Sequence, residues 1–123
     1  MAYNPYEQYK TASINTMTPG EMLIALYDEI IKQLNKSIIF IQEKNIPEAN
    51  KSLIKSQDII NYLIATLDDS YPISAQLTAM YEFFNQQIIQ SNIKKETAYI
   101  DEILPMITDL KVTFAQADKL ARK

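Results

Sequence analysis

The residue types that most often carry out catalysis are missing from this chain, and carboxylates are the main candidates that remain. The 123 residues include no His and no Cys, which excludes an imidazole base, a thiolate nucleophile and the ordinary kind of zinc site. Acidic pairs at Asp28-Glu29, Asp68-Asp69 and Asp101-Glu102 could in principle serve acid–base chemistry or bind a hard cation. Neighbouring residues on a helix point about 100° apart, so the two carboxylates of such a pair cannot both reach the same atom. We interpret the pairs as solvated surface and predict no catalytic residue, no metal site, no cofactor and no enzyme.

Glycine content and charge exclude further classes of function. The single glycine, Gly20, cannot build the glycine-rich loops that hold nucleotide phosphates. The chain has 12 Lys and Arg against 15 Asp and Glu, a formal net charge of -3, and its basic residues are scattered, so we expect no nucleic-acid partner. No apolar run approaches the roughly 20 residues that span a bilayer, and the first residues do not resemble a signal peptide. These features predict a cytosolic protein without stable membrane insertion.

The elements that must position any functional residue are predicted to be helices. Apolar residues recur at intervals of three and four through four long stretches, the pattern of amphipathic helices. Thr18 and Glu21 form a capping box that starts the first stretch. The predicted helices are residues 18–44, 47–68, 73–94 and a fourth that Thr97 caps. Their short links favour antiparallel neighbours, so we predict an all-α domain, an up-down-up-down four-helix bundle over residues 18–120.

Two segments depart from this regular pattern. Residues 1–17 contain Tyr3, Tyr6 and Tyr9 among polar residues and lack a sustained apolar stripe, which predicts a partly ordered tail. Pro105 falls inside the fourth apolar stretch, where proline removes a backbone hydrogen bond and crowds the preceding turn. We expect a kink or a later helix start there, with the proline ring facing away from the core.

The helices carry more apolar residues than one core stripe needs. Residues that fall beside or opposite the predicted stripe are Ile39, Phe40, Ile59, Tyr62, Ile89 and Ile93. Single exposed apolar residues are normal on any protein, and each of these alone is explained by packing under a tail or loop. Together they suggest surface grooves that would accept an amphipathic or disordered partner segment. The tyrosine tail is a candidate occupant of such a groove when no partner is bound.

Several sequence blocks occur in an order and spacing that resemble one known family. They are Tyr9; T-P-G-E-M-L-I-A-L-Y-D at 18–28, similar to S-P-x-x-L-I-x-M-L-Y-D; K-S-Q-D-I-I at 55–60, similar to K-A-Q-D-I-I; Leu67-Asp68; and M-Y-E-F-F-N-Q-Q-I-I-Q-S-N-I-K-K at 80–95, similar to L-Y-D-Y-M-N-x-x-L-I-x-A-N-I-K-K. The chain resembles the FliS family of flagellin-specific export chaperones from about Tyr9 to Phe114. It departs from the family at Gln86-Gln87, where Arg-Arg is common, at Phe114, where Trp is frequent, and at Pro105.

The resemblance implies a function for the grooves. It implies an antiparallel bundle that binds the disordered C-terminal segment of flagellin as short helices, prevents premature polymerisation and aids delivery to the export gate protein FlhA. FliW is a further partner that it suggests. The resemblance also implies that the tail, with Tyr9 as its anchor, packs on the bundle when flagellin is absent. The candidate partner contacts are therefore Tyr9, Ile59, Tyr62, Ile89 and Ile93.

Other interpretations of the surplus apolar surface remain open. The chain could be a non-catalytic homo-oligomeric bundle, or an adaptor for another amphipathic segment. Association with a membrane surface is a third alternative, against which the acidic balance argues. For the chaperone interpretation we expect a monomer or a weak homodimer.

Overall fold

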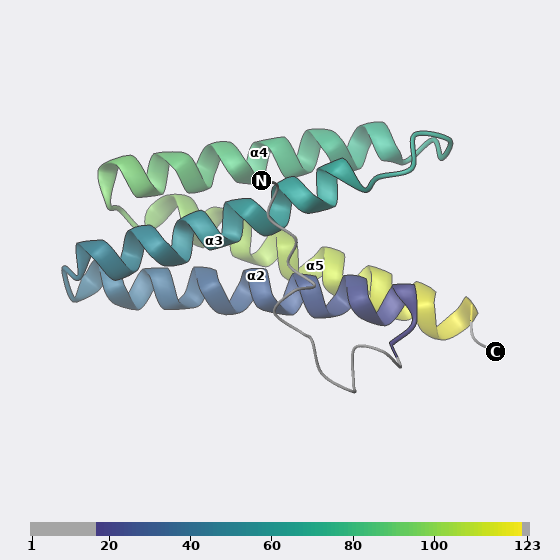
Figure 1. Ribbon diagram of the computed structural model, residues 1–123, viewed down its shortest axis with the longest axis horizontal. Coiled ribbons are helices and arrows are strands. Elements are labelled where there is room, and N and C mark those ends of the chain that lie inside the picture. The colour runs from purple at the N-terminus through teal and green to yellow at the C-terminus, as the bar shows by residue number, and fades with distance from the viewer. Residues whose placement is uncertain (1–16, 122–123) are drawn as a thin grey trace.

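The computed structural model describes residues 17–121 and shows four α-helices packed side by side (Figure 1). The helices are α2 (Pro19–Gln42), α3 (Ile46–Ala65), α4 (Ser74–Lys94) and α5 (Ala98–Ala121). Each helix packs against the next one in the chain, and α5 packs back against α2. This closed arrangement confirms the predicted antiparallel four-helix bundle. The tail residues 1–16, including Tyr9, lie outside the described residues.

The start of α2 is fixed by the predicted capping box. The Glu21 backbone N–H donates to Thr18 Oγ1 over 3.1 Å, and the Thr18 N–H donates to Glu21 Oε1 over 3.1 Å. Pro19 occupies the first helical position, where its missing N–H has no partner to lose. The local sequence therefore determines where the bundle begins.

A lysine occupies the position at the end of α2 where a glycine is usual. The N–H of Asn45 donates to the Phe40 carbonyl over 2.8 Å, and that of Lys44 donates to the Ile41 carbonyl over 3.0 Å. These two bonds define a Schellman motif, and Lys44 adopts the left-handed conformation that it requires, with φ of 58°. Asn45 then caps α3, because its side chain accepts from the Glu48 N–H. The turn joins α2 directly to α3 at the cost of placing a side chain in a glycine-type position.

Replacing Lys44 with glycine is expected to raise the free energy of unfolding by about 0.5–1 kcal/mol, because the steric cost of the left-handed conformation disappears. Urea denaturation followed by circular dichroism measures the change. The matched control is Lys36→Gly in the exposed middle of α2, which should destabilise by about 1 kcal/mol. Destabilisation by both substitutions would contradict the stated role of Lys44.

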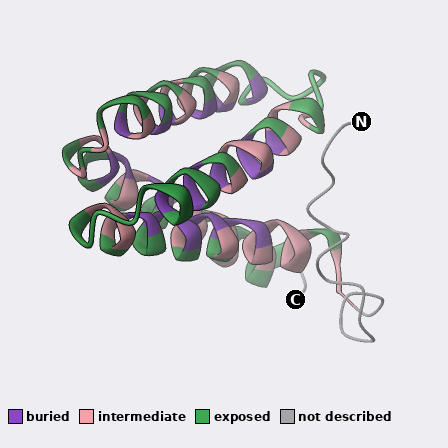
Figure 2. Ribbon diagram, turned by 60° about the vertical axis from the view of Figure 1, so that its left-hand side comes forward, coloured by how far each residue is buried: buried purple, intermediate pink, exposed green. Residues whose placement is uncertain are grey.

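Large apolar side chains from all four helices fill the interior, and the buried sides of the ribbons face one another (Figure 2). The largest fully buried residues are Tyr27, Phe84, Leu26, Ile30, Leu34, Leu53, Ile59, Ile60, Ile88, Ile100, Ile103 and Ile107. Small residues are buried on α2 and α3, namely Ser37, Ala49, Ser52 and Ser56, and small side chains let two helices approach closely. The hydroxyls of Ser37 and Ser56 donate to carbonyls of their own helices, so their burial leaves no donor unpaired.

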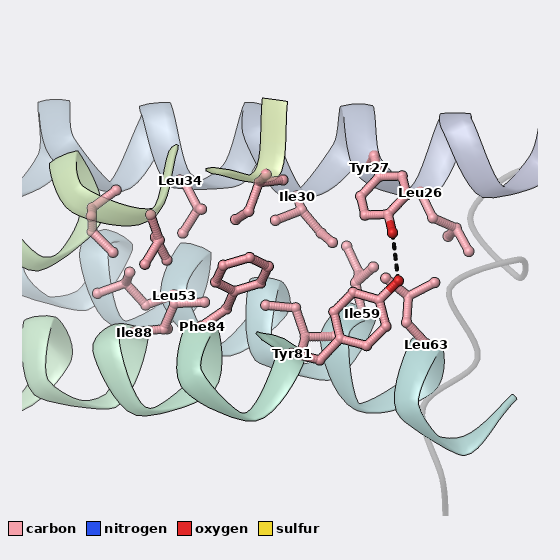
Figure 3. Close-up of a cluster of buried hydrophobic side chains, with 14 of the residues drawn as sticks. Leu26, Tyr27, Ile30, Leu34, Leu53, Ile59, Leu63, Tyr81, Phe84 and Ile88 are labelled. Carbon is pink, nitrogen blue, oxygen red and sulfur yellow. Dashed lines mark hydrogen bonds between the residues drawn. The ribbon is translucent and has the colours of Figure 1, made fainter. Parts of the chain in front are cut away.

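Two tyrosines place a hydrogen bond inside this apolar core (Figure 3). The hydroxyls of Tyr27 on α2 and Tyr81 on α4 lie 2.5 Å apart, and the ring of Tyr27 stacks on Phe114 of α5 with centroids separated by 5.9 Å. Burial raises the pKa of Tyr27 far above its ordinary value, and the neighbouring Tyr81 raises it further. Burial also raises the pKa of Tyr81, although its hydrogen bond with Tyr27 lowers it. Both rings are therefore neutral wherever the protein is folded at ordinary pH.

The fourth helix accommodates Pro105 without a later start. Of the two alternatives expected at Pro105, a kink or a later helix start, the later start does not occur, because α5 begins at Ala98 and continues through the proline. Pro105 is exposed, as predicted, so its ring faces away from the core. Because proline has no N–H, the carbonyl of Asp101 receives no α-helical hydrogen bond from it. That carbonyl lies on an exposed turn, where another donor can satisfy it at little cost.

Candidate partner-binding face

The structure divides the predicted contact residues into buried and exposed groups. Ile89 and Ile93 on α4 are 39% and 71% exposed, whereas Ile59 on α3 is fully buried. Tyr62 is partly buried and packs against the core cluster. Tyr9 lies outside the described residues. Only Ile89 and Ile93 therefore present a substantial apolar surface in the form that sequence reasoning expected.

The expected place of Ile59 at the edge of the core stripe requires correction. Ile59 and Ile60 point about 100° apart on α3, yet both are fully buried. The reason is that α3 contacts α2 on one side and α4 on the other, so its buried arc is wider than a single stripe. In this structure Ile59 is a core residue that packs among Tyr81, Leu63 and their neighbours (Figure 3).

Ile89 and Ile93 belong to an ordered surface that we call the α3/α4 face, defined by Asn50, Ile54, Asn61, Asn85, Ile89, Asn92 and Ile93. Asparagine pairs join the two helices at both ends of this surface. Asn92 Nδ2 donates to Asn50 Oδ1 over 2.8 Å, and Asn85 Nδ2 donates to Asn61 Oδ1 over 2.7 Å. The α3/α4 face is thus tied across the helices at two levels, with isoleucines between and beside the ties.

Sequence reasoning missed one isoleucine of this face. Ile54 is 44% exposed and lies one turn from Asn50, within the span of α3 that the two asparagine pairs enclose. Ile89 lies within the matching span of α4. The signal for Ile54 was the i, i+4 spacing from Asn50 and i, i+7 spacing to Asn61, which puts the three residues on one side of α3. Tyr62 is not part of this face, because it is partly buried and packs against the core cluster.

Polar groups hold the face in a defined geometry. Lys95 Nζ donates to both the backbone carbonyl and Oδ1 of Asn92, over 2.5 and 2.6 Å, so the amide nitrogen of Asn92 is left to donate to Asn50. At the other tie, Asn85 Oδ1 is buried and has no hydrogen-bond partner, which leaves an acceptor beneath the face. A rigid surface with apolar side chains and amide edges can bind a peptide without any covalent chemistry.

Within residues 17–121, no three acidic side chains gather in a way that could hold a metal ion. None of the helices described here is both long and apolar enough to cross a membrane. The bundle and its α3/α4 face define an all-helical protein whose surface presents exposed isoleucines and asparagine amides.

Comparison of the sequence with known proteins identifies the family to which the chain belongs. The family model for the flagellar protein FliS matches residues 2–121, so the chain belongs to the FliS family. The flagellar secretion chaperone FliS of Bacillus subtilis is 35% identical over 120 residues, which cover 98% of this chain and 90% of that protein. The protein of the same name from Vibrio cholerae is 28% identical over 116 residues, covering 89% and 85% of the two chains. Family membership agrees with the prediction of a non-catalytic protein.

The fold is also that of a solved relative. A crystal structure of a flagellar chaperone from bacteria superposes with a TM-score of 0.79 at 21% sequence identity, covering 93% of this chain and 94% of the other. The four-helix arrangement is therefore shared, while most side chains differ.

Proposed function

We propose that this protein is a cytosolic flagellar secretion chaperone that binds the disordered C-terminal segment of flagellin on its α3/α4 face. Family membership and the names of the relatives support the chaperone role. The observation that carries the choice of surface is the pair Ile89 and Ile93, which stand exposed beside Ile54 on a face tied at both ends by asparagine pairs. Holding flagellin there would prevent its premature polymerisation and present it to the export gate protein FlhA, with FliW as a further partner.

The energetics of this binding follow from apolar burial. Leu, Ile and Val side chains of the partner would cover the three isoleucines, and burial of apolar surface contributes about 25 cal/mol per Å². Ordering a disordered segment opposes this gain by about 2–5 kcal/mol or more. Side chains that are already hydrogen-bonded add less ordering cost on binding, and the asparagine pairs and Lys95 are bonded in this way in the free protein.

The test is a titration of the full chain with a peptide of the last ~50 flagellin residues from the same organism, a length that holds several helical segments. Calorimetry and circular dichroism are expected to show binding with a negative heat-capacity change and a gain of helicity. The double substitution Ile89→Asp, Ile93→Asp should weaken the affinity by about tenfold or more, a loss of about 1.4 kcal/mol. The helical content of the free protein should stay unchanged, because both side chains are exposed.

The control is Ile39→Asp, which places one carboxylate on an exposed isoleucine of α2 and is compared with the single variant Ile93→Asp as well as with the double variant. It should leave the affinity within about twofold of the parent chain, a change under 0.5 kcal/mol for a contact outside the interface. Equal losses from the control and the double variant would contradict the assignment to the α3/α4 face. No binding by the folded parent chain would contradict the proposed function and favour a homo-oligomeric bundle, which sedimentation at low concentration would reveal.

A further inference from the structure

A second groove runs between α2 and α5, a pair of helices other than the two that form the α3/α4 face. Two open hollows mark it. One of about 470 Å³ is lined by Ile31, Asn35, Asp101, Leu104, Pro105, Thr108 and Asp109. The other, of about 490 Å³, is lined by Met17, Glu21, Ile24, Ala25, Asp28, Ala115, Asp118 and Lys119. The lining residues of each hollow come from both helices, so the groove follows the line where α2 and α5 meet.

The floor of this groove is apolar along its length. Ile24 and Ile31 of α2 lie two turns apart on one side of that helix, and Leu104 and Ala115 line the opposite wall. Val112, 47% exposed, lies one turn from Thr108 on the same side of α5, between the two hollows. Asp101 and Lys119 are the first and last residues of α5 that line the two hollows. At 1.5 Å per residue the groove between them is about 27 Å long, enough for a helix of about 18 residues.

The rim of the groove is acidic. The lining residues include the carboxylates Glu21, Asp28, Asp101, Asp109 and Asp118 and one ammonium, that of Lys119. Lys111 adds a second ammonium, because its Nζ lies 2.5 Å from Asp28 Oδ1. Five carboxylates and two ammoniums therefore line or flank the groove, so its charged side chains are mainly acidic.

Pro105 adds a hydrogen-bond acceptor at the same place. It lines the first hollow together with Asp101, and its missing N–H leaves the Asp101 carbonyl without its usual helical donor. The Leu104 carbonyl keeps its helical donor, because residue 108 is a threonine with a backbone N–H, and it also accepts from Thr108 Oγ1 over 2.9 Å. An acceptor beside two carboxylates suits an ammonium or guanidinium donor.

We propose that the groove between α2 and α5 is a docking surface for a cationic amphipathic helix of a protein partner. Apolar residues of that helix would fill the floor, and flanking Lys or Arg side chains would meet Asp101, Asp109 and the freed Asp101 carbonyl. The tail of this chain does not fit that description, because residues 1–16 contain one Lys and one Glu and so carry no excess of basic side chains. This surface is separate from the α3/α4 face and does not depend on the function proposed for it.

The test uses a fluorescent 14-residue peptide of Leu and Lys, designed as a helix with one apolar and one basic side, and the same peptide with Glu in place of Lys. Anisotropy titration of the full chain at low salt should show binding of the Lys peptide, weakening as salt is added, and no binding of the Glu peptide. The double substitution Asp101→Lys, Asp109→Lys should weaken binding of the Lys peptide by about tenfold or more. Both residues are exposed, so the fold should be unchanged by circular dichroism.

The charge-matched control is Glu43→Lys, Glu82→Lys, which makes the same change in net charge at exposed positions outside the groove. This control variant should keep most of the parent chain's affinity for the Lys peptide. A loss equal to that of the groove variant would overturn the proposal, since binding would then follow net charge alone. Undiminished binding by the groove variant would also overturn it. The variant Ile89→Asp, Ile93→Asp should bind the Lys peptide normally, and a loss there would place the peptide on the α3/α4 face instead.

Discussion

The substitution Ile59→Ala is expected to lower the free energy of unfolding by about 2–5 kcal/mol, the range for truncating a buried aliphatic side chain. Ile59 is fully buried in the core cluster, so the alanine variant loses apolar burial and leaves a cavity between α3 and its neighbours. Urea denaturation monitored by circular dichroism gives the change, and the flagellin peptide should still bind the fraction that remains folded.

The control for this prediction is Ile54→Ala on the same helix. Ile54 is 44% exposed, so its truncation should cost less than about 1 kcal/mol. It should instead weaken flagellin binding, because Ile54 belongs to the α3/α4 face. A small stability loss for Ile59→Ala, comparable with that of Ile54→Ala, would contradict the placement of Ile59 in the core.

Stability is expected to fall steeply when the pH rises above about 10, the ordinary pKa of tyrosine. The pKa values of Tyr27 and Tyr81 are raised in the folded protein, so above that pH the unfolded chain releases phenol protons that the folded chain retains. A group whose pKa is higher in the folded chain than in the unfolded chain makes its full contribution to stability below the unfolded pKa. That contribution is lost as the pH rises. Each proton retained costs about 1.4 kcal/mol of stability per pH unit, and the raised pKa of Tyr81 adds to the slope in the same direction.

Denaturation midpoints measured at neutral pH and at several points above pH 10 test this expectation. The matched variant is Tyr27→Phe, which keeps the ring stacked on Phe114 and removes one of the two titrating hydroxyls. Its stability should depend less steeply on alkaline pH, after a loss at neutral pH of about 1 kcal/mol for the hydrogen bond. Identical alkaline slopes for the two proteins would rule out Tyr27 as a source of the effect.

Local signals in the sequence were sufficient to predict the helices and one of their ends. The capping box of Thr18 and Glu21 lies within four residues and forms as expected. Apolar periodicity likewise depends on neighbours in the chain, so four helices and their antiparallel order could be predicted. The left-handed Lys44 could not, because the usual glycine signal for this turn is absent and the geometry is held by the bonds of Lys44 and Asn45.

The candidate face was predicted only in part, because its organisation depends on contacts between distant residues. The exposure of Ile89 and Ile93 follows from their position on α4 alone. The asparagine ties join residues 24 and 42 positions apart, and the tyrosine hydroxyls meet across 54 positions. Ile59 was misplaced for the same reason, since the width of the buried arc on α3 depends on two neighbouring helices.

The packing of α2 against α5 brings together the two ends of the described chain. Met17 and Lys119 line one hollow, and Gly20 lies against Asp118. The other three packed pairs join helices that follow each other in the chain, and such contacts form at low entropic cost because the loops that they close are short. Folding can therefore proceed through successive helical hairpins, whereas the junction between α2 and α5 requires the first and last helices described here to come together.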